Sequence, residues 1–422
     1  MEEPNIPDWL TADFLKSCLE SDEQNKEGVV INSYNAKSAV PPGNNYGSNI
    51  LQVKIVYQKL FDSAEYSLSL IIKAPLVVGA FVEQFGDVLN EAYLREPKYY
   101  NEFITESYKL MKHDIVPRHY KSPNPLCVVL EDLKRSGYVM VDRQKLLDFD
   151  HCQLYIKASA KLHALTIAVH KTHPDIIESL VKENPITTEK TEQVFKHLMR
   201  NLFMCMATYL EDKEEYKEFE DFFRDISEGE TFFNIYQGVE KTKSRLTAVI
   251  QNDPWCTNMM FKYNSSGDVL GVKLFDFQNL KFATPLRELV TFVWTSANPE
   301  VREKKLHELY QIYCDSLNCT FKQLGCSERL STEELKEEIL FLSPLVIVTV
   351  CALAPFCLAD EAVNVSDFLN ANNPDVPIKE SHNYRLYQGT TFNKYFPQIM
   401  NQIAKEGIFE HIKQKMKHLS TT

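Results

Sequence analysis

Several features that mark other classes of protein are missing from this chain. Its ten cysteines form no C-x-x-C pair and no cysteine–histidine cluster with zinc spacing, so we expect neither a disulfide scaffold nor a zinc domain. The first residues are acidic and contain no apolar core of a secretory signal, which predicts a cytoplasmic protein with reduced thiols. Internal repeats and low-complexity tracts are also missing.

Positive charge is in the minority. Lysine and arginine total 46 against 58 aspartates and glutamates, a net charge of −12. This balance argues against nucleic acid or an anionic membrane as the main partner, although it leaves room for a local basic pocket. With 44% hydrophobic and 25% charged residues among 422, the composition is that of a globular chain with two or three compact units.

One long apolar run needs a separate interpretation. No charged side chain occurs in the 21 residues from Ile339 to Ala359, a length that would span a bilayer. Two prolines interrupt the run, and Ser331 with Glu334 forms the pattern of a capping box that starts a helix before it. A buried core helix is therefore favoured, with a membrane span as the alternative.

The first third of the chain has the pattern of a small sheet. An amphipathic stretch around Trp9 and Phe14 predicts an N-terminal helix, and residues 41–48 are rich in turn residues. Apolar alternation or continuous apolar runs predict strands at 53–57, 68–73 and 126–130. Residues 76–115 look helical, with a break or restart at Pro97.

Beyond residue 145 the pattern is mostly helical, as in the apolar spacing of residues 154–169. Short strands are expected at 247–250, 259–263 and 271–275, and the turn at 264–267 makes the last two a hairpin. We therefore expect an α+β, two-lobed fold. Its parts would be an N-terminal extension (1–35), a small antiparallel-sheet lobe (36–132), a larger, mostly helical lobe (133–415) and a C-terminal tail (416–422).

The residues with the clearest chemical meaning lie on that hairpin. Asp253 is followed five residues later by Asn258, and Asp276 follows 18 residues after that, at the end of the second strand. Transfer of a phosphoryl group from ATP needs a carboxylate beside the attacking hydroxyl, and an amide and a second carboxylate for magnesium. Asp and Asn also favour ordinary turns, which is the competing interpretation for each residue taken alone.

Taken together, these motifs resemble the ecdysteroid kinase-like (CHK kinase-like) family, relatives of choline kinase and aminoglycoside phosphotransferases with a protein kinase-like fold. The family's catalytic stretch is H-G-D-x-W-x-N-N-x-M-F followed by D-F-Q, and the positions that match it here are Asp253, Trp255, Asn258, Met260, Phe261 and residues 276–278. Its G-x-N-Y-x-S loop is matched at 43–48, its L-E-D-L segment at 130–133 and its A-x-L-H helix at 160–163.

The resemblance implies a role for each matched position. Asp253 would orient and deprotonate the substrate hydroxyl, and Asn258 and Asp276 would bind Mg²⁺. Lys73 would reach the phosphates of ATP and pair with Glu96, for which Glu91 is a rival.

Two further segments would hold the nucleotide. The backbone from Glu131 to Leu133 would meet adenine. The loop residues expected to cover the phosphates are Gly43, Asn45, Tyr46 and Ser48.

The implied function is an ATP-dependent kinase for a hydroxyl of a small lipophilic alcohol, with an ecdysteroid-like steroid suspected and a monomer expected. The sequence departs from the family at Gln251 and Asn252, which replace its His and Gly. The alternative is therefore a silent pseudokinase that binds nucleotide or ligand. Other candidates are weaker: His163 is expected to be an interior histidine, and the aromatic residues of the helical lobe are expected to be mainly core.

Overall fold

The computed structural model describes residues 6–40, 48–76, 93–181, 189–242, 244–361, 363 and 376–421. The chain forms two compact units that are not contiguous in sequence. The first unit comprises Met1–Val139, His173–Lys182 and Met260–Leu280, and the second comprises Met140–Thr172, Glu183–Met259 and Lys281–Thr422. The hairpin that carries Asp276 therefore groups with the N-terminal sheet.

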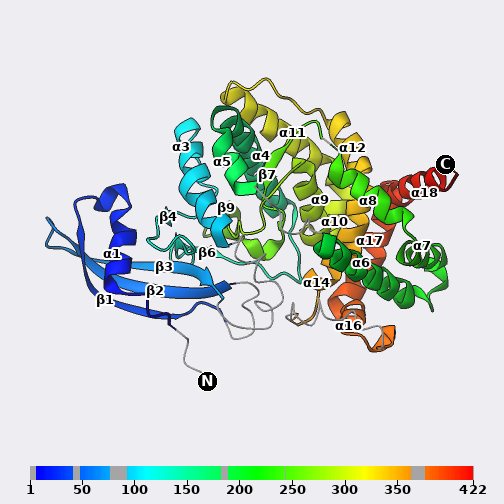
Figure 1. Cartoon of the computed structure of the whole chain (residues 1–422), viewed down its shortest axis with the longest axis horizontal. Helices are drawn as coiled ribbons and strands as arrows, with labels where there is room; N and C mark the ends of the chain where they lie inside the picture. Colours follow the sequence, from blue (N-terminus) through cyan, green and yellow to red (C-terminus); the bar gives the residue numbers. More distant parts are fainter. Residues whose placement is uncertain are drawn as a thin grey trace. The chain divides into compact units, whose positions relative to one another are not determined.

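A five-stranded antiparallel sheet is the centre of the first unit (Figure 1). Its order is β1-β2-β3-β5-β4, with strands β1 (Val29–Ser38), β2 (Ser48–Lys59), β3 (Glu65–Pro75), β4 (His119–Tyr120) and β5 (Val128–Glu131). The three strands expected from the sequence lie within or overlap β2, β3 and β5, and β3 ends at Pro75 as predicted. β1 was not expected, because it is an edge strand with almost no buried apolar side chains to create an alternating pattern.

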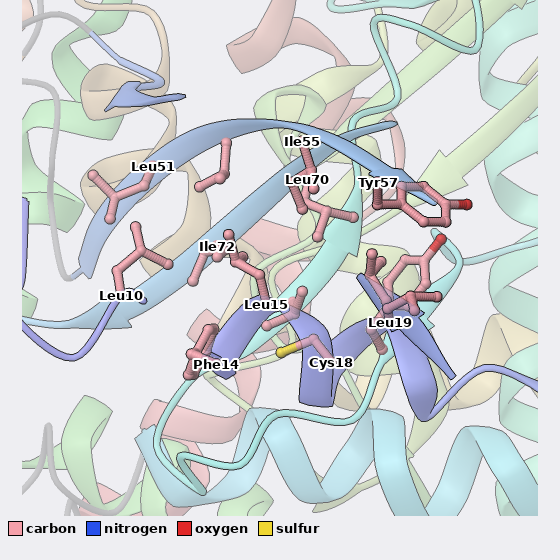
Figure 2. Packing of buried hydrophobic residues seen from close by; sticks show 14 residues of the cluster. Leu10, Phe14, Leu15, Cys18, Leu19, Leu51, Ile55, Tyr57, Leu70 and Ile72 are labelled. Atoms are coloured by element: carbon pink, nitrogen blue, oxygen red, sulfur yellow. The ribbon is translucent and has the colours of Figure 1, made fainter. Parts of the chain in front are cut away.

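The expected N-terminal helix is present and covers one face of this sheet. α1 (Ala12–Glu20) begins after Thr11, whose side chain accepts the N–H of Phe14, and leads through the 3₁₀ turn η1 (Glu23–Asn25) to β1. Figure 2 shows its apolar face directed at the side chains of β2 and β3. The buried cluster contains Leu10, Phe14, Leu15, Cys18, Leu19, Val29, Leu51, Val53, Ile55, Tyr57, Leu70, Ile72, Tyr120 and Val129.

A helical segment follows β3 in the first unit. Residues 93–98 are α-helical, the π-helical turn η2 (Tyr99–Ile104) follows directly, and α3 (Thr105–Leu110) completes the segment. The predicted break at Pro97 is wrong, since the helix continues through it. A proline removes one backbone hydrogen bond, and the burial of Tyr99, Tyr100 and Phe103 stabilises the continued helix. The earlier part of this predicted helix, residues 77–92, lies outside the described residues.

The predicted hairpin is formed by β8 (Met259–Tyr263) and β9 (Val269–Leu274), with β6 (Tyr138–Val139) on the other side of β8. Oδ1 of Asn264 accepts the N–H groups of Ser266 and Asp268, which closes the turn. Gly267 takes φ +89°, a value that glycine adopts without steric cost. The short helix α5 (Pro174–Val181) also belongs to this unit and packs against η2.

The second unit is mainly helical, with one two-stranded sheet of β7 (Ala248–Ile250) and β10 (Lys281–Ala283). The long helix α4 (Phe149–Thr172) includes the predicted helix at 154–169 and packs against α11 (Leu306–Gln323). The remaining helices are α6 (Glu189–Leu210), η4 (Glu214–Tyr216), α7 (Lys217–Glu228), α8 (Thr231–Lys241), η5 (Cys256–Asn258), α9 (Pro285–Ser296), α10 (Pro299–Lys304), η7 (Ile378–Glu380), α16 (His382–Gln388), α17 (Thr390–Lys405) and α18 (Ile408–Thr421).

The long apolar run is divided among α12 (Thr332–Phe341), α13 (Ser343–Val348), the π-helical turn η6 (Thr349–Leu353) and α14 (Ala354–Cys357). The capping box of Ser331 and Glu334 is confirmed, but the expectation of one core helix is wrong. Pro344 stands in the first turn of the helix that runs from Ser343 to Cys357, where a missing N–H costs little. Pro355 lies inside that helix, directly after its π-helical turn. In the described residues no single helix is long and apolar enough to cross a membrane. The two helices Thr332–Phe341 and Ser343–Cys357 would together be long and apolar enough, but they meet at a bend of 63°.

Candidate active site

Lys73 lies near the end of β3, on the face of the strand opposite to Leu70 and Ile72, because successive side chains of a strand alternate. Its Nζ is 2.6 Å from Oε2 of Glu96 and 2.6 Å from Oδ1 of Asp276. The predicted pairing of Lys73 with Glu96 is therefore confirmed. Glu91, the rival, lies outside the described residues.

The side chains of Lys73, Glu96 and Asp276 are largely buried, and they bring together one positive and two negative groups. Burial lowers the pKa of Lys73, but Asp276 and Glu96 outweigh it and hold that pKa above its ordinary value. Burial raises the pKa of Glu96, against the opposing effect of Lys73 and with a further rise from Asp276. One ammonium thus faces two carboxylates, and the excess negative charge suits a cation at this position.

Glu96 also positions the segment that carries Asp276. Its second oxygen, Oε1, accepts the backbone N–H of Phe277 at 3.0 Å. The ring of Phe277 is stacked on Tyr99, with centroids 4.2 Å apart, and meets Tyr100 edge-on at 5.8 Å. Asp276 itself takes φ +66°, which an aspartate tolerates better than most residues. The Asp276 carboxylate is therefore held by its contact with Lys73 and by the anchored residue that follows it, Phe277.

The segment expected to meet adenine leaves the sheet at the end of β5. Oδ2 of the buried Asp132 accepts hydrogen bonds from Nε2 of Gln52 at 2.6 Å and from Oγ of Ser69 at 2.8 Å. Glu131 accepts the N–H of Arg118 at 2.9 Å, and Leu133 is buried. These contacts fix the backbone from 131 to 133.

The expected phosphate-covering loop is described only at its end. Ser48 is buried at the first position of β2. The other three residues proposed for this loop, Gly43, Asn45 and Tyr46, lie outside the described residues.

In the second unit, Asp253 and Asn258 contact each other across the loop between β7 and η5. Nδ2 of Asn258 donates to the backbone oxygen of Asp253 at 2.9 Å and to its Oδ2 at 3.1 Å. Asn258 is buried and Asp253 is half-buried. Because the amide nitrogen is used in this way, Oδ1 is the atom of Asn258 that can serve as a ligand to a cation.

This loop is anchored from beneath by a buried carboxylate that sequence patterns did not identify. Glu288 of α9 accepts the backbone N–H of Gln251 at 2.6 Å. It also accepts the hydroxyls of Tyr155 at 2.8 Å and Ser159 at 2.7 Å, and lies 3.3 Å from Nε2 of His163. Burial would raise the pKa of Glu288, but His163 and these hydroxyl donors lower it to about 2.

His163 is the interior histidine that the sequence suggested. It is buried, and its Nδ1 lies 3.0 Å from the hydroxyl of Tyr313. Its two ring nitrogens therefore face Tyr313 and Glu288, and its role is to support the loop.

Asn252, which stands where the family pattern has glycine, adopts a backbone conformation typical of glycine. Asn252 takes φ +61°, in the left-handed region that Asn tolerates. Oδ1 of Asn252 accepts a hydrogen bond from Nε of Arg287 at 3.2 Å. Arg287 also donates a hydrogen bond to the hydroxyl of Tyr236 at 3.2 Å and forms an ion pair with Glu240. Arg287 and Glu288 lie 35 and 37 residues from their loop partners, so no local motif could have identified them.

The residues present fit magnesium better than a metal held entirely by protein. Among the described residues no group of three or more His, Cys, Asp or Glu side chains could hold a metal ion. Magnesium bound with a nucleotide needs only one or two protein ligands, because water and phosphate oxygens complete its shell. The Asp276 carboxylate and the Asn258 amide oxygen are hard ligands of that kind.

Comparison with known proteins gives a family match. The model of the ecdysteroid kinase-like family matches residues 42–326, which is more than half of the chain. None of the curated proteins compared with it is a significant match. Among solved structures, Plasmodium vivax ethanolamine kinase is similar at 10% sequence identity and a TM-score of 0.39, over 89% of this chain and 83% of that one. The chain belongs to the ecdysteroid kinase-like family of small-molecule kinase-like proteins and has a kinase-like α+β fold.

Proposed function

We propose that this protein transfers the γ-phosphoryl group of ATP to a hydroxyl of a small lipophilic alcohol, with an ecdysteroid-like steroid as the suspected substrate. The observation that carries the proposal is the contact of Lys73 with both Glu96 and Asp276. A kinase needs a lysine positioned by a helical glutamate for the phosphates, and an aspartate nearby for the metal. Residues 73, 96 and 276 reach this arrangement from three distant parts of the chain.

In this proposal Lys73 binds the ATP phosphates and Asp276 and Asn258 hold Mg²⁺. The metal, when bound, neutralises charge on the phosphate oxygens. Asn258 directly precedes β8, and Asp276 follows two residues after the end of β9. Because only residues 264–268 connect these neighbouring strands, we expect the hairpin to bring the two ligands to one ion.

Asp253 is the proposed catalytic carboxylate. It would accept a hydrogen bond from the substrate hydroxyl and orient its oxygen towards the γ-phosphorus of ATP. It would take the hydroxyl proton as the new P–O bond forms and the bond from the γ-phosphorus to the bridging oxygen breaks, with ADP as the leaving group. The two hydrogen bonds from Asn258 hold the Asp253 side chain and backbone in one orientation. A carboxylate positioned in this way loses little freedom when the substrate binds.

The rest of the nucleotide would be held mainly by backbone. In this proposal the chain from Glu131 to Leu133 meets adenine, and its orientation is supported by the buried Asp132. Ser48 and the loop residues Gly43, Asn45 and Tyr46 would bring N–H groups to the phosphates.

Apolar side chains beside Asp253 support a lipophilic acceptor. Trp255 is half-buried and lies 6.2 Å, centroid to centroid, from Phe356 of α14. One turn earlier, Leu353 is 39% exposed although both of its neighbours in the chain are buried. It ends a π-helical turn, a feature that often accompanies functional sites. These three side chains would contact the apolar body of the alcohol.

A second candidate function is a catalytically silent protein that binds nucleotide or ligand. The observation in its favour is the replacement of the family His and Gly by Gln251 and Asn252. The left-handed backbone at Asn252 and the anchored N–H of Gln251 instead support an intact loop, so turnover is the first choice.

The direct test is incubation of the purified protein with Mg·ATP and a panel of hydroxylated lipophilic compounds, including ecdysteroids, followed by mass spectrometry. We expect one product with the added mass of a phosphate. Asp253→Asn should abolish it while leaving the thermal shift produced by Mg·ATP. Asp268→Asn, in the exposed turn between β8 and β9, is the matched control and should behave like the wild type. A thermal shift without any product would favour the silent protein, and no shift at all would contradict both candidates.

A further inference from the structure

A groove in the second unit lies between α8 and α18, beside the end of α12. Its volume is about 500 Å³, within the range of small-molecule sites. The residues that line it include Ile235 and Val239 of α8 and Phe341 of α12. Among the described residues, none that is assigned above to nucleotide, metal or catalysis belongs to this lining. The groove is therefore a separate feature of the helical unit.

The wall formed by α8 is apolar and contains a gap. Ile235 and Val239 are buried, and Gly238 lies between them in the interior of the helix. A Cβ added at Gly238 would meet no atom within 4 Å, so the missing side chain leaves open space in the groove. Glycine is disfavoured inside a helix, and packing against other parts of the protein does not require it here.

The opposite wall carries basic side chains, of which Lys415 is the charged one. His411, Lys415 and His418 follow each other at spacings of four and three along α18, which places them on one face of the helix. Among the residues that the structure describes, no carboxylate lines the groove, although the chain carries a net charge of −12. Glu410, in the first turn of α18, accepts Nε2 of Gln414 at 3.0 Å and is not part of the lining.

Two basic side chains of this wall, Lys415 and His411, lie close to apolar surface or are partly buried. Nζ of Lys415 is 4.7 Å from the centroid of the Phe341 ring. Nε2 of His411 is buried and has no hydrogen-bond partner among the described residues. Burial lowers the pKa of Lys415, and burial together with Lys415 lowers the pKa of His411. An anion placed between these two groups would relieve both effects.

We propose that this groove binds a small molecule with an apolar body and a single anionic group, such as a carboxylate or a sulfonate. The apolar body lies along Ile235, Val239 and Phe341 and fills the space over Gly238. The anionic group meets Lys415 and accepts a hydrogen bond from His411. The charge of the lining selects an anion, and its volume suits one small molecule.

The test uses two fluorescent probes that share an apolar body. 8-Anilinonaphthalene-1-sulfonate is anionic, and N-phenyl-1-naphthylamine has no charge. We expect the folded protein to bind the sulfonate at one site. Lys415→Met should weaken the sulfonate about tenfold and leave the neutral probe unchanged. Lys413→Met is the matched control, since Lys413 lies on the same helix but pairs with Glu218 outside the groove.

A second variant tests the groove itself. Gly238→Leu should exclude both probes while the protein stays folded, because the new side chain enters open space. A melting temperature equal to or above that of the wild type would verify folding. Sulfonate binding that neither Lys415→Met nor Gly238→Leu changes would overturn the proposal. A dimer seen by sedimentation in the wild type but lost in Gly238→Leu would assign the groove to a second copy of the chain, and would also overturn it.

Discussion

Glu288 accepts the backbone N–H of Gln251 at 2.6 Å, two residues before Asp253. The same buried carboxylate is bonded to Tyr155 and Ser159 of α4 and lies against His163. The loop between β7 and η5 is therefore attached to two helices through one side chain. In this arrangement the position of Asp253 depends on a buried charge that takes no part in the proposed reaction.

We predict that Glu288→Gln weakens both stability and turnover. The folded-state pKa of Glu288 is about 2, below the ordinary value of 4.5. A lowered carboxylate pKa adds stability above pH 4.5, and that stability is lost as the pH falls towards 2. Its size is on the order of 3 kcal/mol. The wild-type unfolding free energy should therefore fall more steeply between pH 4.5 and 2 than that of the variant.

Urea unfolding at several pH values measures this difference. Glu300→Gln is the matched control, because Glu300 forms an exposed pair with Lys304 and should leave the pH profile unchanged. If Glu288 positions the loop, kcat falls while the KM for ATP stays close to wild type. If the unfolding free energies of Glu288→Gln and the wild type fell in parallel as the pH is lowered, the prediction that Glu288 has a lowered pKa in the folded protein would be wrong.

The contact of Glu96 with Lys73 leads to a second prediction. Glu96→Gln removes one of the two charges that hold Nζ of Lys73, while the contact with Asp276 remains. We expect kcat/KM for ATP to fall by about tenfold or more, because the lysine is then held by Asp276, the proposed metal ligand. Glu106→Gln is a control in the same helical segment, since its pair with Lys109 is on the surface. Equal kinetics for the two variants would exclude a role for Glu96.

A third prediction concerns the residue that replaces the family glycine. Asn252→Ala should cost about 1–2 kcal/mol, because alanine is strained at φ +61° and cannot accept Nε of Arg287. Asn252→Gly keeps the backbone conformation and should retain more stability and most of the activity. Thermal unfolding and steady-state turnover of both variants measure the two effects. If both variants lost similar amounts of stability, the loss would come from the missing hydrogen bond to Arg287 and not from backbone strain at position 252.

The N-terminal helix gives a prediction about the small sheet. Leu15 is fully buried between α1 and the strands, as Figure 2 shows. Leu15→Ala should destabilise the protein by about 2–5 kcal/mol through the cavity it leaves. Lys16→Ala, on the exposed side of α1, should change stability by less than about 0.5 kcal/mol. A small effect of Leu15→Ala would mean that α1 contributes little to the folding of the sheet.

Local patterns in the sequence determined much of this protein. Alternation of apolar residues predicted β2 and β3, turn residues predicted the hairpin of β8 and β9, and the capping box predicted the start of α12. The resemblance to the ecdysteroid kinase-like family rested on the ordered set of motifs at 43–48, 130–133, 160–163, 253–261 and 276–278. These features depend on residues that are close in the chain, where backbone preferences and side-chain periodicity act directly.

Tertiary structure decided the rest. β1 forms because β2 offers it an edge, and the helix through Pro97 persists because its aromatic side chains are buried. Glu288 and Arg287 reach the loop of Asp253 from α9, and α8 and α18 together create the groove with its basic wall. Such contacts join residues that are distant in the chain, and their free energy comes from burial and charge pairing that only the folded chain provides.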